Sequence, residues 1–229
     1  HIGMDLRVIG NVGQVQLMQA NLRFEKSVQR AVEGSDAVIN LVAVLYEAGQ
    51  QSFEALHVRG AETLAKAVAA EGITNFVHVS AIGADKDSQS DYARTKGEGE
   101  EIVRKHVPTA DILRPSIMFG NEDEFFNRFA SMAQLSPALP LMGGGKTKFQ
   151  PTYVADVADA IARRVEAEAS AQTFELGGLQ TYSFKELMQF MLETIGKKRL
   201  LVPVPWFAAN MMGFGGEMIG AMPFLEPFL

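Results

Sequence analysis

The sequence predicts an α/β fold built on a parallel sheet. Short β-branched runs alternate with longer segments of helical periodicity over residues 15–113. Residues 37–42 are almost continuously apolar, which is typical of a strand that is buried on both faces of a sheet. Strand and helix succeed each other at a spacing that favours parallel strands joined by right-handed crossovers.

Expected strands and helices alternate through the first half of the chain. Its expected strands are β-branched or apolar runs, and its expected helices have apolar residues three or four positions apart. Gly34 and Gly72 end two of the helices. In order, the elements are a strand at 15–21, a helix at 24–32, a strand at 37–42, a helix at 52–70, a strand at 76–80, a helix at 92–106 and a strand at 111–113.

Beyond residue 120 the alternation of expected strands and helices becomes less regular. Helices are expected at 125–134 and 155–165, and a short strand at 173–176. Residues 136–145 are rich in Pro and Gly and predict a loop. Ser183 and Glu186 have the spacing of a capping box, which predicts the start of a further helix. From residue 202 the chain is apolar and rich in Met, Phe, Gly and Pro.

Composition excludes several classes of protein. The net charge is −6 and basic residues are not clustered, so there is no electrostatic footprint for nucleic acid. The sequence has no Cys, which excludes disulfides, thiolate nucleophiles and Cys-ligated zinc. The 4 histidines lack the spacing of a metal site, and no apolar run reaches the roughly 20 residues of a membrane span.

Tyr92 and Lys96 form the most informative pair in the sequence. They lie four residues apart at the start of an expected helix, so their side chains share one face. An ammonium beside a phenol favours the phenolate, and we expect it to lower the tyrosine pKa from its usual value of about 10. Such a pair can donate or accept a proton in carbonyl and alcohol chemistry.

Seven motifs follow one another along the chain: Ala20-Asn21-Leu22, residues 36–43, Val58-x-Gly60, His78-Val79-Ser80, Tyr92-x-x-x-Lys96, residues 113–120 and residues 153–158. In this order they resemble the extended, partly atypical, short-chain dehydrogenase/reductase superfamily. The combination of residues 10–14, 79–85 and 125–129 narrows the resemblance to the NAD(P)-binding accessory subunits of respiratory complex I and their bacterial relatives, often labelled NAD-dependent epimerase/dehydratase.

The resemblance implies a Rossmann-type, doubly wound parallel sheet that binds NAD or NADP. Residues 1–120 would form the dinucleotide-binding domain, to which residues 149–177 return. Residues 121–148 and 178–229 would form a small substrate-side lobe.

The same resemblance assigns roles to individual residues. It implies that Tyr92, Lys96 and Ser80 are catalytic and lie by the nicotinamide, with Lys96 also reaching its ribose. The other implied cofactor contacts are Asn21 and Leu22 by the adenine, Leu41, Val42 and Ala43 along the central portion, and Pro115, Ser116 and Ile117 over the nicotinamide ring.

Two departures from the family pattern matter. The family usually has Ser or Thr where this sequence has Ala81, and the neighbouring Ser80 would point to the other face of a strand. The family's opening strand, its glycine-rich loop and its first helix are not found, so about sixty native residues are expected to precede His1. Gly10 and Gly13 do not replace that loop, because a strand rather than a helix is expected after them.

The resemblance and its two departures lead to three candidate functions. The first is hydride transfer between nicotinamide and a carbonyl, alcohol or quinone-like substrate. The alternatives are a catalytically silent nucleotide-binding accessory or assembly subunit of a respiratory NADH dehydrogenase, which Ala81 favours, and a nucleotide-sugar epimerase or dehydratase. Expected partners are a lipophilic small molecule and a respiratory-complex or membrane-peripheral partner, in the cytoplasm or at the inner membrane, without nucleic acid or a transmembrane span.

We expect the 229-residue chain to bind NAD or NADP weakly or not at all. The physical reason is that the glycine-rich loop supplies the backbone N–H groups that hold the pyrophosphate. Isothermal titration calorimetry with NADH and with NADPH measures this directly, and a clear binding signal from either nucleotide contradicts the expectation.

Overall fold

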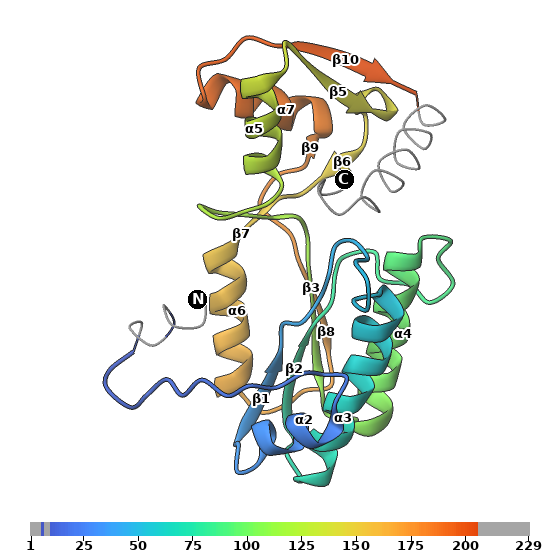
Figure 1. Ribbon diagram of the computed structural model, residues 1–229, viewed down its shortest axis with the longest axis vertical. Helices are drawn as coiled ribbons and strands as arrows, with labels where there is room; N and C mark the ends of the chain where they lie inside the picture. Colours follow the sequence, from blue (N-terminus) through green and yellow to red (C-terminus); the bar gives the residue numbers. More distant parts are fainter. Residues whose placement is uncertain (1–5, 7–9, 206–229) are drawn as a thin grey trace. The chain divides into compact units, whose positions relative to one another are not determined.

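The computed structural model describes residue 6 and residues 10–205 of the chain. Their contacts divide the chain into two compact units (Figure 1). The first unit extends to Leu113 and includes Arg163–Phe174, and the second comprises Arg114–Ala162 and the described residues from Glu175. The domain boundaries expected from the sequence, at residues 120, 149 and 177, stay predictions.

The first unit is built on a four-stranded sheet. The strand order is β1 (Ala37–Asn40), β2 (Asn75–Val79), β3 (Asp111–Pro115) and β8 (Thr173–Leu176). β2 runs parallel to both β1 and β3, with Val38 opposite Phe76 and Val77 opposite Asp111. The α/β class with a parallel central sheet is therefore confirmed, and β1 forms one edge of the sheet in the part of the chain that the structure describes.

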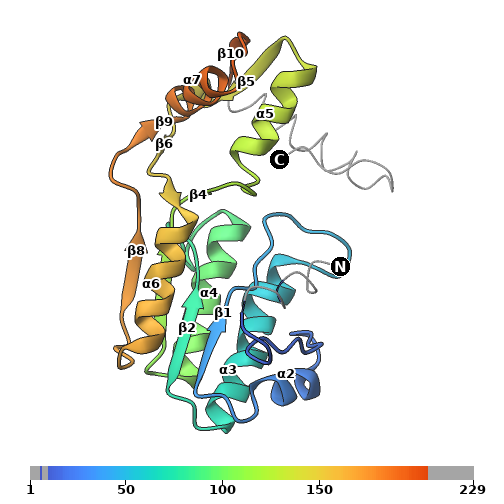
Figure 2. The ribbon, with the colours of Figure 1, turned by 90° about the vertical axis from the view of Figure 1, so that its left-hand side faces the viewer.

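Helices pack on the sheet face that carries Val38 and Phe76. They are α2 (Glu25–Val32), the π-helix η2 (Glu54–Gly60), α3 (Ala61–Ala70), which continues η2, and α4 (Asp91–His106). Figure 2 shows α2, α3 and α4 beside β1 and β2. One cluster of buried side chains joins the three helices to β2, because each helix turns an apolar stripe toward the sheet.

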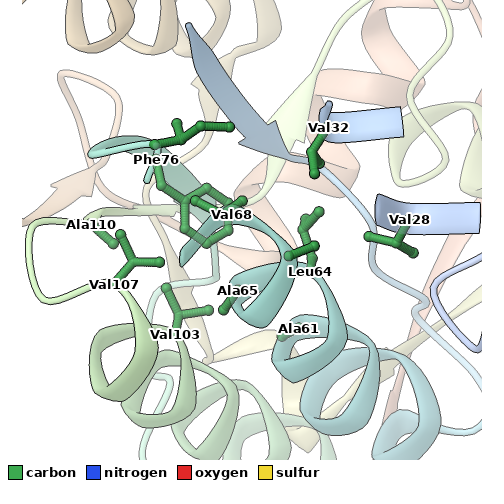
Figure 3. Packing of buried hydrophobic residues seen from close by; sticks show 12 residues of the cluster. Val28, Val32, Ala61, Leu64, Ala65, Val68, Phe76, Val103, Val107 and Ala110 are labelled. Carbon is green, nitrogen blue, oxygen red and sulfur yellow. The ribbon is translucent and has the colours of Figure 1, made fainter. Parts of the chain in front are cut away.

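Phe76 of β2 lies at the centre of this cluster. In Figure 3 its ring lies against Val68 of α3, with Val103 of α4 and Val32 of α2 around it. All four side chains are buried. The helices are thereby fixed against the sheet, and one of them, α4, carries the predicted catalytic residues Tyr92 and Lys96.

Asp111, at the start of β3, joins this strand to Arg163–Phe174, the later segment of the first unit. Its carboxylate accepts hydrogen bonds from Arg164 (2.9 and 2.7 Å), the Ser170 hydroxyl (2.7 Å) and the Gln172 backbone N–H (3.1 Å). These donors come from the end of α6 (Val154–Glu166) and from the turn before β8. Burial by itself would raise the pKa of Asp111, but the bonds from Ser170, Gln172 and Arg164 outweigh it and the pKa is lowered.

The second unit has its own core between α5 (Phe126–Leu135), α7 (Phe184–Thr194) and a small sheet of β5 (Ala138–Met142) and β10 (Leu200–Val204). The capping box is confirmed, because Ser183 Oγ accepts from the Glu186 N–H and the Glu186 carboxylate accepts from the Ser183 N–H. The remaining short elements are β4 (Met118–Phe119) paired with β7 (Thr152–Tyr153), β6 (Lys148–Phe149) paired with β9 (Tyr182–Ser183), and the 3₁₀ turn η3 (Gly143–Gly145).

Three expectations about local structure differ from what is found. Residues 15–21 do not form a strand, because a strand needs a ladder partner and this exposed segment has none among the described residues. The expected loop at 136–145 contains β5, and Pro140 is tolerated there because each strand of a two-stranded sheet is an edge. The helix expected at 52–70 begins as the π-helix η2.

The apolar tail from residue 206 lies outside the described residues. Within the described ranges, no helix is both long enough and apolar enough to cross a membrane.

Replacing Asp111 with Ala is expected to lower the free energy of unfolding by about 3 kcal/mol at pH 7, because it breaks a buried ion pair. The carboxyl has a lowered pKa when folded, so its contribution is present above the unfolded pKa of about 4 and is lost as the pH falls through the folded value. Urea denaturation at pH 7 and at pH 3 measures both effects. Asp36→Ala, which removes an exposed carboxylate, is the control, and equal stabilities of wild type and Asp111→Ala at pH 7 would contradict the prediction.

Candidate functional site

The three residues predicted to be catalytic come from one end of β2 and the start of α4. Ser80 follows directly after β2, and Tyr92 and Lys96 lie in the first two turns of α4. All three belong to the first unit. In open sheets of parallel strands, ligands bind at the carboxyl ends of the strands, which is where Ser80 lies.

Lys96 is a buried cation that reaches the end of β2. Its side chain is only 2% exposed, and Nζ donates a hydrogen bond to the Val79 carbonyl oxygen at 3.2 Å. Burial lowers the pKa of Lys96 to about 8, against the opposing effect of Glu100 one turn further along α4. Near neutral pH the ammonium therefore remains mostly charged, at a cost in stability.

Ser80 directly follows Val79, the residue whose carbonyl accepts from Lys96, and it carries a hydroxyl without a hydrogen-bond partner among the described residues. Its backbone N–H donates to the Leu113 carbonyl oxygen at 2.7 Å, which joins it to β3. Its side chain is 5% exposed, and Oγ has no hydrogen-bond partner among the residues that the structure describes. A buried hydroxyl without a partner is costly, so this atom fits a place where a polar group of a ligand completes the bonding.

The Tyr92 ring packs in a small aromatic cluster. It lies edge-on to Phe53, with ring centroids 5.7 Å apart, and edge-on to His57 at 5.5 Å. The side chain is half-buried, and burial raises the pKa of the phenol. The expectation that Lys96 lowers this pKa is therefore wrong for the chain by itself, since desolvation dominates.

Two buried histidines and an asparagine support the strand ends. Asn40 Nδ2 donates to His78 Nδ1 at 3.0 Å, and Asn40 Oδ1 accepts the Val42 N–H at 3.1 Å. Burial, with Lys96 nearby, lowers the pKa of His78 to about 3, so its imidazole is neutral and can accept. His57 accepts the Val44 N–H. The interpretation of both histidines as structural agrees with these bonds, but the sequence offered no signal that they organise the loop after β1.

The other predicted cofactor contacts of the first unit lie in the loop after β1 and in the turn before α2. Leu41, Val42 and Ala43 are exposed in the loop that follows β1. Asn21 accepts the Arg23 N–H through Oδ1 (3.0 Å) in the turn before α2, and Leu22 packs against the core of the first unit. Their roles toward a cofactor stay predictions.

Pro115, Ser116 and Ile117 belong to the second unit, where β3 ends. The Ser116 N–H donates to the Leu176 carbonyl oxygen and the Ile117 carbonyl accepts the Thr152 N–H, both at 2.9 Å. Their predicted place over a nicotinamide ring also stays a prediction. Over the described residues, no three His, Asp or Glu side chains gather in a way that could hold a metal ion.

Comparisons with known proteins agree with the motifs found in the sequence. The model of the NAD dependent epimerase/dehydratase family matches residues 4–177. The NADH dehydrogenase [ubiquinone] 1 alpha subcomplex subunit 9, mitochondrial, of Arabidopsis thaliana is 37% identical over 227 residues, covering 97% of this chain and 56% of that protein. The NADH-ubiquinone oxidoreductase 40 kDa subunit, mitochondrial, of Neurospora crassa is 35% identical over 201 residues, covering 87% of this chain and 52% of that protein.

The chain therefore spans about half the length of these relatives. Among solved structures, dTDP-glucose 4,6-dehydratase from Streptomyces venezuelae with NAD and TYD bound superposes with a TM-score of 0.77 at 20% identity, covering 88% of this chain and 70% of that one. At this identity the likeness shows the fold alone, and it confirms the Rossmann-type class. The resemblance to the complex I accessory subunits and the epimerase/dehydratase family is confirmed as well.

Replacing Lys96 with Met is expected to stabilise the chain near neutral pH, by up to roughly 3 kcal/mol, because it removes a buried charge whose pKa is lowered from 10.5 to about 8. The unfolded chain binds this proton more tightly, so wild-type stability should rise with pH between these two values, and the variant should lack that rise. Urea denaturation at pH 7, 8, 9 and 10 measures the slope. The exposed Lys66→Met is the control, and identical slopes for wild type and Lys96→Met would refute the prediction.

Proposed function

Because the chain belongs to the NAD dependent epimerase/dehydratase family, we propose that it contributes the reactive end of a nicotinamide dinucleotide site. The complete protein binds NAD or NADP, and its reaction is hydride transfer between the nicotinamide and a carbonyl, alcohol or quinone-like substrate. The observation that carries this proposal is the buried Lys96 ammonium, which donates to the last residue of β2. The residue that follows this strand, Ser80, has a hydroxyl without a partner among the described residues.

The proposal accounts for two features that are costly in a purely structural protein. A buried ammonium and a buried hydroxyl without a partner each lower stability. Both become useful when a ligand with hydroxyl or carbonyl groups occupies the strand ends, since Lys96 Nζ and Ser80 Oγ can donate to it. Bound nicotinamide would supply or accept the hydride, which no side chain of this chain can do.

In this proposal Tyr92 is the proton donor. Burial keeps the phenol protonated near neutral pH, so Tyr92 Oη can donate to the alkoxide that develops when a carbonyl is reduced. In the occupied site the positive charge of Lys96, four residues along the same helix face, stabilises the phenolate that remains, an effect that desolvation outweighs in the chain by itself. The aromatic cluster keeps water from one side of the Tyr92 ring.

The second candidate function is a catalytically silent accessory or assembly subunit of a respiratory NADH dehydrogenase. Two observations favour it: the relatives are NADH dehydrogenase subunits, and Ala81 stands where the related reductases carry a hydroxyl. In this case Lys96 and Ser80 hold the nucleotide as a structural element, and the partner is the respiratory complex. Either function is compatible with a cytoplasmic protein at the periphery of the inner membrane.

Tyr92→Phe in the complete protein tests the first candidate. We expect kcat for NADPH- or NADH-dependent carbonyl or quinone reduction to fall by about 100-fold or more, with unchanged nucleotide affinity, because only the proton donor is lost. Tyr182→Phe, which removes a hydroxyl bonded to Gln180 on an exposed strand, is the control and should keep full activity.

Steady-state kinetics and nucleotide titration separate the two candidates. If the wild-type protein binds NADH or NADPH but turns over no carbonyl compound or quinone, the accessory-subunit function is supported. If it binds neither nucleotide, both candidates are refuted.

A further inference from the structure

Both ring nitrogens of His57 are hydrogen-bonded near the candidate site, and neither function described above assigns this side chain a role. It lies in the π-helix η2 and is 2% exposed. The Val44 backbone N–H donates to its Nε2 at 3.2 Å, and its Nδ1 lies 3.1 Å from Thr95 Oγ1. Since a backbone N–H only donates, Nε2 must be the acceptor, and the ring proton is therefore on Nδ1 and donated to Thr95.

The bond to Thr95 continues into α4. Thr95 Oγ1 donates its own hydrogen to the Asp91 carbonyl oxygen at 2.7 Å, so it accepts from His57 without conflict. This chain of bonds fixes one tautomer of the imidazole. It connects the loop after β1, the π-helix η2 and the first turns of α4, which come from three separate parts of the sequence.

The ring of His57 also contacts the ring of Tyr92, the proposed proton donor. His57 stacks on Phe53, with centroids 5.3 Å apart and planes at 21°, and both rings present themselves at nearly right angles to Tyr92. Edge-to-face contacts of this kind are favourable and directional. The orientation of the Tyr92 ring is thus set from η2 as well as from its own helix.

The backbone of His57 is held as tightly as its side chain. The main chain of α4 passes so close at Gly99 that a Cβ there would lie 2.3 Å from the His57 carbonyl oxygen. Only glycine permits this approach, so η2 and α4 are in direct backbone contact at His57. A π-helical turn at this point is a further sign of local specialisation, because such turns occur frequently at functional sites.

We propose that His57 is a positioning residue that sets the Tyr92 ring and the loop at Val42–Val44 in one common arrangement. The inference rests on the proposed function and on the predicted contact of Val42 and Ala43 with the same nucleotide that Tyr92 faces. The imidazole must be neutral to accept from Val44. Burial, with the charge of Lys96 nearby, lowers the pKa of His57 to about 4, so the neutral form prevails at physiological pH, and the hydrogen bond from the Val44 N–H favours that same form.

Three substitutions separate the parts of this role. His57→Gln can keep an acceptor at the position of Nε2 for Val44, while His57→Asn can keep a donor at the position of Nδ1 for Thr95. His57→Phe keeps an aromatic ring of similar size without either bond. His106→Gln removes an imidazole from the far end of α4 and is the matched control.

Hydrogen exchange of the 229-residue chain, which needs no ligand, gives the first measurement. We expect the Val44 amide to exchange about tenfold faster in His57→Phe and His57→Asn, with protection close to wild type in His57→Gln and His106→Gln. Unchanged Val44 protection in both His57→Phe and His57→Asn overturns the proposal. If His57→Phe fails to fold, the comparison of His57→Gln with His57→Asn decides in the same way.

Nucleotide binding by the complete protein gives the second measurement. We expect the Kd for NADH or NADPH to rise about tenfold in His57→Phe and His57→Asn, with recovery in His57→Gln, because the loop is placed only when Val44 has its acceptor. Loss of Val44 protection with an unchanged Kd makes His57 purely structural and overturns the proposal. Wild-type protein that binds neither nucleotide overturns the proposed function and this inference with it, whereas wild-type binding with equal affinity in all variants overturns this inference alone.

Discussion

The close contact between the η2–α3 segment and α4 is the constraint on which the first unit depends. Gly99 allows the two backbones to meet, and Ala61 and Val103, both fully buried, continue the contact toward the core. Small side chains are needed here, because any larger group would separate the helices. At one end this packing covers Phe76 and the sheet, and at the other end it brings His57 and Phe53 against Tyr92.

The same region carries polar groups that weaken the fold. Lys96 holds a charge in a buried place, and Ser80 has a hydroxyl without a partner among the described residues. Asp111, in contrast, is buried with its bonds complete and supports the fold. Asp111 therefore has the features of a structural charge, whereas Lys96 and Ser80 have those of groups arranged for a ligand, because stability is commonly given up at functional sites.

Local sequence patterns predicted most of the regular elements. The 3.6-residue periodicity of α2, α4 and α6 and the apolar runs of β1, β2 and β3 are strong signals, since each element buries one face or both. The strand expected at 15–21 failed because pairing is not a property of one segment. β5 was missed for the same reason, since its partner β10 lies some sixty residues further along the chain and Pro140 resembles a loop residue.

By itself the sequence determined the α/β class, the order of the elements, the family motifs and the Tyr92–Lys96 pair, because these depend on residue type and spacing within short windows. Only the tertiary structure decided how the pair is placed. Lys96 donates a hydrogen bond to the Val79 carbonyl, Tyr92 has a raised pKa, and His57 accepts a hydrogen bond from the Val44 N–H and donates one to Thr95. The physical reason is that burial and hydrogen-bond geometry come from contacts between distant segments. A pKa or a tautomer depends on those contacts, and spacing along the chain does not contain them.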